Sequence, residues 1–352
     1  MTTIHVAASR AYDVAIEHGL LSRLGSLAAG LLPGRRAAII SDDTVYPLYG
    51  GLAERSLTDA GFQVERFVFP HGEQHKNLNT YGQALNFLCD RRFTRSDLII
   101  ALGGGVVGDL AGFTAATYQR GIAYIQVPTT LLSMVDSSVG GKTAVDLDSG
   151  KNQAGCFYQP ALVLCDPALL ETLPEAEYRA GCAEIIKTAV LFSPELFQQL
   201  KTTPIREQFE PVIATCVGMK RDVVQNDEFD RGQRALLKLG HTIGHAVEAC
   251  SNFTILHGEG VAIGLAAITR AAVEKGICDP ALLPQVLDIL KQYGLPTEVP
   301  YPLADIQKAA EADKKRSGSV TKFVVPEAMG RCRTEPVPAA EVAGWLKAGG
   351  IQ

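Results

Sequence analysis

Three of the seven histidines lie close together in the sequence, at positions 241, 245 and 257. His241 and His245 are four residues apart, so a helix would place both on one face, about one turn from each other. Imidazole nitrogens bind Zn²⁺, Co²⁺ or Fe²⁺, and a carboxylate from another helix can complete such a set. Three glutamates are candidates for that ligand: Glu184, Glu248 and Glu259. The residues alone support a catalytic metal site and a structural histidine pair equally, and the missing glutamate after His241 excludes an HExxH protease.

A glycine-rich turn indicates a second chemical site. Residues 103–108 read GGGVVG and fit G-x-G-x-x-G, between an apolar run at 98–102 and a helical pattern at 106–118. Such a turn lets the backbone approach a pyrophosphate, whose charge the free N–H groups of the following helix stabilise. The usual acidic residue at the end of the next strand is missing from the run at 124–127. The pattern therefore favours nucleotide binding in a variant of the Rossmann arrangement over a purely structural turn.

A long polar stretch at 128–155 carries Lys142, Lys151 and Asn152. Its GKT sequence lacks the first glycine of a P-loop, because Asp136 stands at that position, and an ATPase of that type is excluded. Two cations and an amide donor suit a phosphorylated or carboxylated ligand. We expect a functional loop here, although a solvated surface loop explains the composition equally well.

The elements that must position these residues change character along the chain. Strand-like runs alternate with helical patterns in the first half, which predicts a parallel sheet with crossover helices. The strand-like runs are 37–41, 64–69, 98–102, 124–127 and 162–165, with a helix predicted at 78–93. Helical spacing then dominates at 175–200, 207–225, 234–251, 258–276 and 280–293, with one strand at 320–325. We therefore predict an α/β fold with a Rossmann-like domain at 1–174 and a mostly α-helical domain at 175–352.

Composition narrows the class of partner. The 352 residues include 33 Lys and Arg against 38 Asp and Glu, a formal net charge of −5, which argues against nucleic acid or an anionic membrane as partner. No leader pattern or apolar run long enough for a bilayer is visible, and the eight cysteines form no CxxC unit. We expect a cytoplasmic protein without a disulfide framework or a zinc ribbon.

Several longer motifs together resemble one enzyme family. The chain contains GGGVVGDLAGFTAATYQRGI, VPTTLLSMVDSSVGGKTAVD, GKNQAGCFYQP, AGCAEIIK, LGHTIGHAVE, HGEGVAIG and a late DKK. In this order and spacing, from about residue 40 to about residue 330, they resemble 3-dehydroquinate synthase, the second enzyme of the shikimate pathway. The resemblance implies a Rossmann-like domain that binds NAD⁺, a helical domain that binds one Zn²⁺ or Co²⁺, and catalysis between the two.

The resemblance also implies a role for individual residues. The metal ligands would be Glu184, His241 and His257, which makes His245 a catalytic and substrate-binding group. The NAD⁺ contacts would be Asp42, Glu73, Lys76, Gly104, Gly105, Val106, Asp109, Thr129, Thr130, Lys142, Lys151, Leu169 and Thr172. The substrate contacts would be Asp136, Lys142, Lys151, Asn152, Lys187, Lys220, Arg234, His245 and Lys315. Arg120 would reach the phosphate in the neighbouring active site of a homodimer.

The implied reaction is that of a phosphorus–oxygen lyase. The family substrate is 3-deoxy-D-arabino-heptulosonate 7-phosphate, whose C5 hydroxyl is transiently oxidised by NAD⁺ with a metal as Lewis acid. Phosphate elimination, return of the hydride, ring opening and an intramolecular aldol step then give 3-dehydroquinate. NAD⁺ is regenerated in each turnover, so the protein mainly positions the substrate and compensates charge.

Two departures from the family pattern keep an alternative substrate open. Lys238 occupies a position where the family usually has Asn, and Asp230 one where Glu is usual. Lys238 would alter substrate choice, or pair with the substrate carboxylate or with Asp230. The runner-up is therefore a related sugar phosphate cyclase, of the 2-deoxy-scyllo-inosose synthase or sedoheptulose 7-phosphate cyclase type. Retention of DSSVGGKT and Arg234 favours 3-dehydroquinate synthase.

Two further classes are less well supported. An iron-type polyol dehydrogenase shares the plan of an NAD⁺ domain and a helical metal domain, but it has no need for the many cations at the expected substrate site. A ligand-binding homologue without activity has little need for a complete set of metal ligands.

Overall fold

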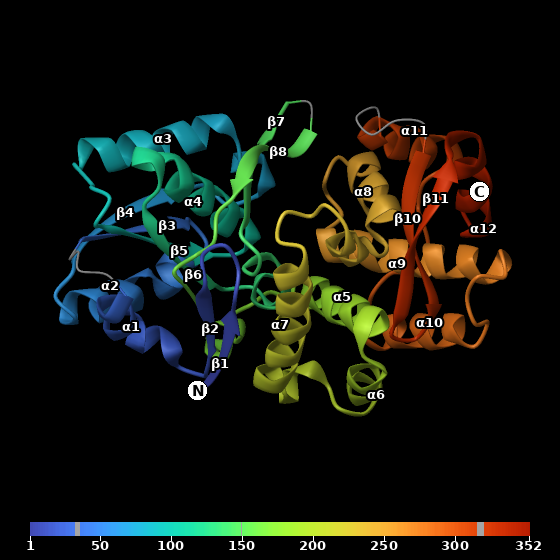
Figure 1. The fold of residues 1–352 in the computed structure, drawn as a ribbon, viewed down its shortest axis with the longest axis horizontal. Coiled ribbons are helices and arrows are strands. Elements are labelled where there is room, and N and C mark those ends of the chain that lie inside the picture. The colour runs from blue at the N-terminus through green and yellow to red at the C-terminus, as the bar shows by residue number, and fades with distance from the viewer. Residues whose placement is uncertain (32–35, 149, 315–319) are drawn as a thin grey trace. The chain divides into compact units, whose positions relative to one another are not determined.

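The computed structural model describes residues 1–31, 36–148, 150–314 and 320–352. It divides into two compact units, which Figure 1 shows in the colours of the chain. Unit 1 comprises Met1–Leu173 and Ile213–Phe229, and unit 2 comprises Pro174–Val212 and Asp230–Gln352. The segment Ile213–Phe229 thus groups with the first unit, although it follows the predicted boundary. Among the described residues, no helix has both the length and the apolar character needed to span a membrane.

Unit 1 is built on a seven-stranded sheet in the order β1-β2-β9-β6-β5-β3-β4. The strands are β1 (Thr2–Val6), β2 (Tyr12–Ile16), β3 (Arg36–Asp42), β4 (Gln63–Phe69), β5 (Leu98–Gly103), β6 (Ala123–Pro128) and β9 (Leu162–Cys165). The pair β1–β2 is antiparallel and the other pairs are parallel, which confirms the predicted parallel sheet. Sequence patterns missed the edge hairpin β1–β2.

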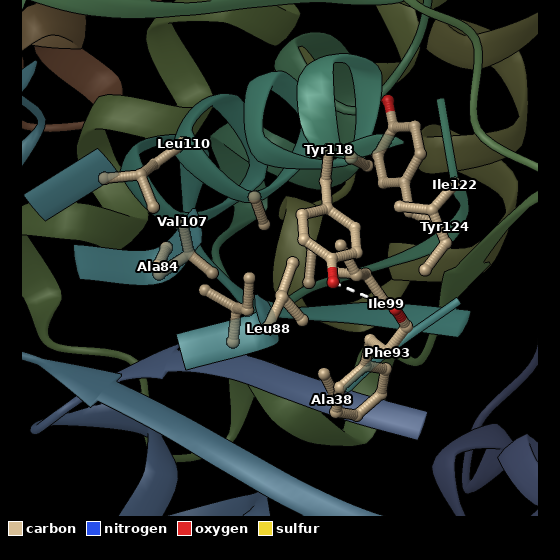
Figure 2. Close-up of a cluster of buried hydrophobic side chains, with 14 of the residues drawn as sticks. Ala38, Ala84, Leu88, Phe93, Ile99, Val107, Leu110, Tyr118, Ile122 and Tyr124 are labelled. Atoms are coloured by element: carbon tan, nitrogen blue, oxygen red, sulfur yellow. Dashed lines mark hydrogen bonds between the residues drawn. The ribbon is translucent and has the colours of Figure 1, made fainter. Parts of the chain in front are cut away.

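Helices cover both faces of this sheet, with α3 and α4 on one side and α1 and α2 on the other (Figure 1). Their bounds are α1 (Leu24–Leu31), α2 (Gly51–Asp59), α3 (Leu78–Asp90) and α4 (Gly105–Thr117). The six residues of β5 are all buried, as expected for a strand covered on both faces. Figure 2 shows the core beneath α3 and α4, where the Tyr118 hydroxyl donates a hydrogen bond of 2.9 Å to the carbonyl of Phe93. This core holds the carboxyl ends of β3, β5 and β6 at one edge.

The polar stretch at 128–155 differs from the loop that its sequence predicts. Most of its second half forms an antiparallel hairpin of β7 (Lys142–Leu147) and β8 (Gly150–Phe157). Thr143 and Val145 are the buried residues of β7, and the charged or small residues that alternate with them hide the strand pattern. The expected site residues Lys142, Lys151 and Asn152 therefore lie on strands, which hold side chains more firmly than a loop would.

Unit 2 is mainly helical. Its helices are α5 (Glu175–Phe192), α6 (Pro194–Thr202), the start of α7 (Phe209–Asn226), α8 (His241–Cys250), α9 (His257–Glu274), α10 (Leu282–Gln292), α11 (Leu303–Lys314) and α12 (Val342–Ala348). An antiparallel pair, β10 (Val320–Ala328) and β11 (Arg331–Pro338), completes it. The strand predicted at 320–325 is confirmed.

Two predicted long helices are interrupted, which corrects the sequence prediction. The helix expected at 175–200 ends before Ser193, which has an extended backbone. The Ser193 hydroxyl accepts a hydrogen bond from the amide of Leu196 and so caps the start of α6. The helix expected at 234–251 is a short 3₁₀ turn, Gln233–Lys238, followed by α8. Gly240 separates the two with φ +79°, a left-handed conformation that suits glycine. Consequently, His241 stands at the first position of α8.

Candidate functional site

Unit 2 brings together the three residues expected to bind a metal. Glu184 lies on α5, His241 begins α8 and His257 begins α9. One potential ligand atom from each lies within 4.8 Å of the others. The Nε2 atoms of His257 and His241 are 3.4 and 3.7 Å from Glu184 Oε1. Three helices, of which α5 is distant in sequence from the other two, thus direct two imidazoles and one carboxylate at a common point.

Glycines allow these helices to approach so closely. A Cβ on Gly258 would lie 2.1 Å from the carbonyl oxygen of Ala180, where α9 meets α5. A Cβ on Gly264 would lie 1.9 Å from the carbonyl oxygen of Gly240, where α9 meets the start of α8. Any larger residue at either position would push the helices apart, and with them the three candidate ligands.

Hydrogen bonds fix the orientation of both imidazoles. Nδ1 of His241 is 3.1 Å from the carbonyl oxygen of Leu239, and Nδ1 of His257 is 2.9 Å from Oε1 of Glu248. Because both partners are acceptors, each Nδ1 must carry the proton and donate it. When such an imidazole is neutral, its Nε2 carries a lone pair, and this lone pair faces Glu184. Glu248, one of the three candidate ligands from the sequence, therefore supports a histidine in this arrangement.

The electrostatics of this cluster keep its carboxylate charged. Burial raises the pKa of Glu184, but the Lys187 ammonium and the two imidazoles outweigh it and hold that pKa well below its usual range. Burial and the Lys187 charge lower the pKa of His241 to about 3. Burial also opposes a charge on His257, but the adjacent carboxylates of Glu184 and then Glu248 raise its pKa to about 9. A charged carboxylate thus faces two imidazoles, of which one is neutral.

A divalent cation fits this set of donors. Both oxygens of Glu184 are buried and accept no hydrogen bond of good geometry, although the Lys187 ammonium lies 2.5 Å from Oε2. Two imidazole nitrogens with one carboxylate oxygen are the ligands that Zn²⁺ and similar borderline metals take in catalytic sites. The same set would be a poor site for Mg²⁺ or Ca²⁺, which prefer oxygen ligands.

His245 lies beside this cluster but has a different environment. It is exposed, and its ring centroid is 5.3 Å from that of His241 and 5.8 Å from that of His257. Geometry alone also allows a second set of ligands, made of His245, Glu248 and His257. That set would use the Glu248 carboxylate that otherwise binds Nδ1 of His257.

The other expected substrate residues of unit 2 differ in burial. Lys187 and Arg234 are 1% and 2% exposed, the latter on the 3₁₀ turn before α8. Lys238 ends that turn, and its ammonium is 3.3 Å from Oδ2 of Asp230, so the two departures from the family pattern pair with each other. The expected residue Lys315 lies outside the described residues.

In unit 1, the expected nucleotide contacts gather at the carboxyl edge of the sheet. Asp42 ends β3, and its Oδ1 accepts the amides of Thr44 and Val45 at 2.9 and 2.8 Å. Gly104 precedes α4, which begins at Gly105, so the free N–H groups of that helix point out from the carboxyl end of β5. The remaining expected contacts at this edge are Val106 on α4, Thr129 and Thr130 after β6, and Leu169 and Thr172 after β9.

A dense charge network lies beside this edge. The buried ammonium of Lys76 is 2.7 Å from Glu73, 3.2 Å from Asp109 and 3.9 Å from Asp146. Lys151 joins it, 3.3 Å from Glu73. Burial raises the pKa of Asp109 against the lowering effect of Lys76, whereas Lys76 and Lys151 outweigh burial and lower that of Glu73. Sequence reasoning missed Asp146, whose only signal was its place among polar residues.

The remaining expected residues of unit 1 lie on α7, on the hairpin β7–β8 and on turns. Lys220 on α7 donates to Asp136, with its ammonium 2.6 Å from Oδ1. Lys142 starts β7 and is exposed, and Asn152 lies in β8 with φ +54°. Arg120 is exposed and follows Gln119, with φ values of +67° and +49°. Two successive left-handed residues other than glycine are strained, a feature that gathers at functional sites.

Comparison with known proteins decides the family. Residues 66–180 match the model of the 3-dehydroquinate synthase N-terminal domain, and residues 181–316 match that of the C-terminal domain. The 3-dehydroquinate synthase of Clostridium botulinum is 44% identical over 328 residues, 92% of this chain and 94% of that protein. The chain belongs to the 3-dehydroquinate synthase family. It is therefore an enzyme of this type.

Two other similar proteins show how this family compares with related cyclases. The 3-dehydroquinate synthase of Enterococcus faecalis strain OG1RF is 42% identical, with 97% of this chain and 98% of that protein covered. The solved structure of a 2-epi-5-epi-valiolone synthase from Streptomyces hygroscopicus, with NAD⁺ and Zn²⁺ bound, has a TM-score of 0.88. It is 28% identical and covers 99% of both chains. Related sugar phosphate cyclases thus share the fold, while the higher identities lie with 3-dehydroquinate synthases.

Proposed function

We propose that this protein converts 3-deoxy-D-arabino-heptulosonate 7-phosphate into 3-dehydroquinate and phosphate, using NAD⁺ and one Zn²⁺ or Co²⁺. The observation that carries the proposal is the convergence of Glu184, His241 and His257 in a chain of the 3-dehydroquinate synthase family. When bound, NAD⁺ supplies a reversible hydride acceptor and the metal supplies a Lewis acid for the alcohol that is oxidised.

The chain's own residues bind and orient these groups. Glu184, His241 and His257 hold the metal, with Leu239 and Glu248 fixing the imidazoles. Exposed His245 stands beside them and contacts the substrate, where an imidazole moves a proton near neutral pH.

Cations and amide donors bind the two anionic ends of the substrate. Phosphate and carboxylate are recognised by Arg and Lys through charge-assisted hydrogen bonds. The residues that we assign to this task are Lys142, Lys151, Asn152, Lys187, Lys220, Arg234 and Lys315, with Asp136 orienting Lys220. The nucleotide is bound by the carboxyl edge of the sheet and the start of α4, whose N–H groups stabilise its pyrophosphate.

We also propose that the enzyme is a cytoplasmic homodimer in which Arg120 reaches the phosphate in the neighbouring active site. The strained backbone at Arg120 supports a functional role, because a surface turn without one would relax. All eight cysteines are free, in keeping with a reducing compartment.

The decisive experiment is incubation with the heptulosonate phosphate, NAD⁺ and Zn²⁺. We expect release of phosphate in step with formation of 3-dehydroquinate, identified by mass and NMR, without net NADH. A different carbocycle would indicate another sugar phosphate cyclase, and NADH that accumulates with a simple polyol would indicate a dehydrogenase.

Variants of the ligands test the site itself. Glu184→Gln, His241→Ala and His257→Ala should each lose activity and bound metal, since each removes one of three protein ligands. His245→Ala should lose rate but keep the metal. Equal metal loss in His245→Ala would contradict the assignment.

A further inference from the structure

One carboxylate in unit 1 links two of the proposed binding residues. Oδ1 of Asp146, on β7, accepts a hydrogen bond of 2.7 Å from the backbone amide of Asn152 on β8. The same oxygen is 3.9 Å from the ammonium of Lys76. Asp146 thus connects a proposed substrate contact with a proposed nucleotide contact.

Asn152 needs such support because of its backbone. Its φ of +54° is left-handed, a conformation that residues other than glycine adopt only when the surroundings stabilise it. A charged acceptor on its amide supplies that stabilisation, because hydrogen bonds to ionised groups are stronger than neutral ones. The hydrogen bond therefore helps to set the direction in which the Asn152 side chain leaves β8.

The main chain of Asp146 is joined to the same network. Its amide donates to the carbonyl oxygen of Lys76 at 2.8 Å, and it forms an isolated parallel bridge with Asn77. The Lys76 side chain is nearly fully buried and also pairs with Glu73 and Asp109. The hairpin β7–β8 is therefore fastened at Asp146 to the segment that carries the proposed nucleotide contacts.

We propose that Asp146 is a positioning residue, which holds Asn152 in its left-handed conformation for the sugar phosphate and ties it to Lys76 at the nucleotide. This inference rests on the proposed function. Asp146 acts through Asn152 and Lys76 without touching the reacting atoms, and its carboxylate must lie where it now accepts the amide.

The first test compares Asp146→Ala with Asp146→Asn. Loss of the acceptor should lower kcat/KM for the heptulosonate phosphate by about 10- to 100-fold in Asp146→Ala, the range expected when a contact group is misplaced. Asn can still accept the amide through its side-chain oxygen, so Asp146→Asn should recover most of that loss. Asp148→Ala is the matched control, because Asp148 is exposed in the same hairpin and has no hydrogen bond or ion pair with another described residue.

The second test asks whether Asp146 acts through Asn152. Asn152→Gly removes the side chain but tolerates the left-handed backbone. In that background and at saturating NAD⁺, Asp146→Ala should cause little further loss of kcat/KM for the sugar phosphate, while in the wild type it causes the full loss. A merely structural role would lower Tm and give independent, multiplicative losses in both backgrounds, which would overturn the proposal.

NAD⁺ binding by calorimetry provides a readout without turnover. We expect Asp146→Ala to raise the Kd for NAD⁺, since Lys76 loses one neighbour. If Asp146→Ala does not fold, Asp146→Glu carries the test: its acceptor is displaced while the charge remains, so KM should rise about tenfold. If the wild type is active but the Asp146 variants keep its KM and its NAD⁺ affinity, the proposed role of Asp146 is wrong and the proposed function stands. A wild type that forms no carbocycle would instead overturn the proposed function.

Discussion

Glu248 offers a quantitative test of the proposed metal centre. Glu248 is 2% exposed, and its Oε1 accepts a hydrogen bond of 2.9 Å from Nδ1 of His257. A hydrogen bond to a charged group is worth about 1.5–3 kcal/mol, and each 1.4 kcal/mol is tenfold in an equilibrium constant. If that bond positions His257 for the metal, Glu248→Ala should raise the Kd for Zn²⁺ by about 10- to 100-fold.

Glu248→Gln should have a smaller effect, near the low end of that range, because the amide oxygen still accepts the proton but carries no charge. The assay is competition for Zn²⁺ against a chelator of known affinity, which requires no catalysis. Glu274→Gln is the matched control, since Glu274 is exposed at the far end of α9, the helix that begins with His257.

The same assay separates the two ligand sets that the geometry allows. With Glu184, His241 and His257 as ligands, Glu184→Gln loses more Zn²⁺ affinity than Glu248→Gln does. With His245, Glu248 and His257 as ligands, that order is reversed. A wild-type Kd in Glu248→Ala would refute the reasoning that the Nδ1 hydrogen bond positions the ligand.

Three further outcomes are expected. Lys142→Ala and Arg120→Ala should each weaken binding of a phosphonate substrate analogue by about 10- to 100-fold, as calorimetry would detect, since each loses a charge-assisted hydrogen bond; an unchanged Kd would remove that residue from the phosphate site. Lys238→Asn should preserve formation of 3-dehydroquinate by NMR, and a switch of product would show divergence towards another cyclase. Burial and then Glu259 raise the pKa of Glu177, so its charged form destabilises the fold as the pH rises through that pKa. Glu177→Gln should therefore raise Tm near neutral pH, with a gain that shrinks towards acid pH; a gain independent of pH would contradict this assignment.

The sequence predicted the parts of the fold in which local pattern and burial agree. The strand at 98–102 is a continuous apolar run because β5 is buried on both faces, and the structure confirms it. The hairpin β7–β8 was missed because Lys142 and Asp146 interrupt its apolar pattern. The break at Ser193 was missed because helical spacing continues across it, although Ser-Pro is a typical start of a new helix.

The candidate site was only partly accessible from spacing. His241 and His245 could be placed on one helix face from their separation, but no spacing rule selects Glu184 from three candidate glutamates. That choice depended on resemblance, since α5 meets α9 through tertiary packing at Gly258. The support of His257 by Glu248 was likewise not predictable, because a hydrogen bond between two helices depends on how they pack.

The pairing of Lys238 with Asp230 bears on substrate choice. The Lys238 side chain is 55% exposed, so its ion pair stabilises the fold by only about 0–1 kcal/mol. Stability therefore does not explain a lysine at this position. A weak ion pair also costs little to break. The Lys238 ammonium can therefore contact an anion that binds nearby, and it can return to Asp230 when the anion dissociates. Because Asp230 holds the Lys238 ammonium in an ion pair in the absence of an anion, we expect the same product from Lys238 as from Asn.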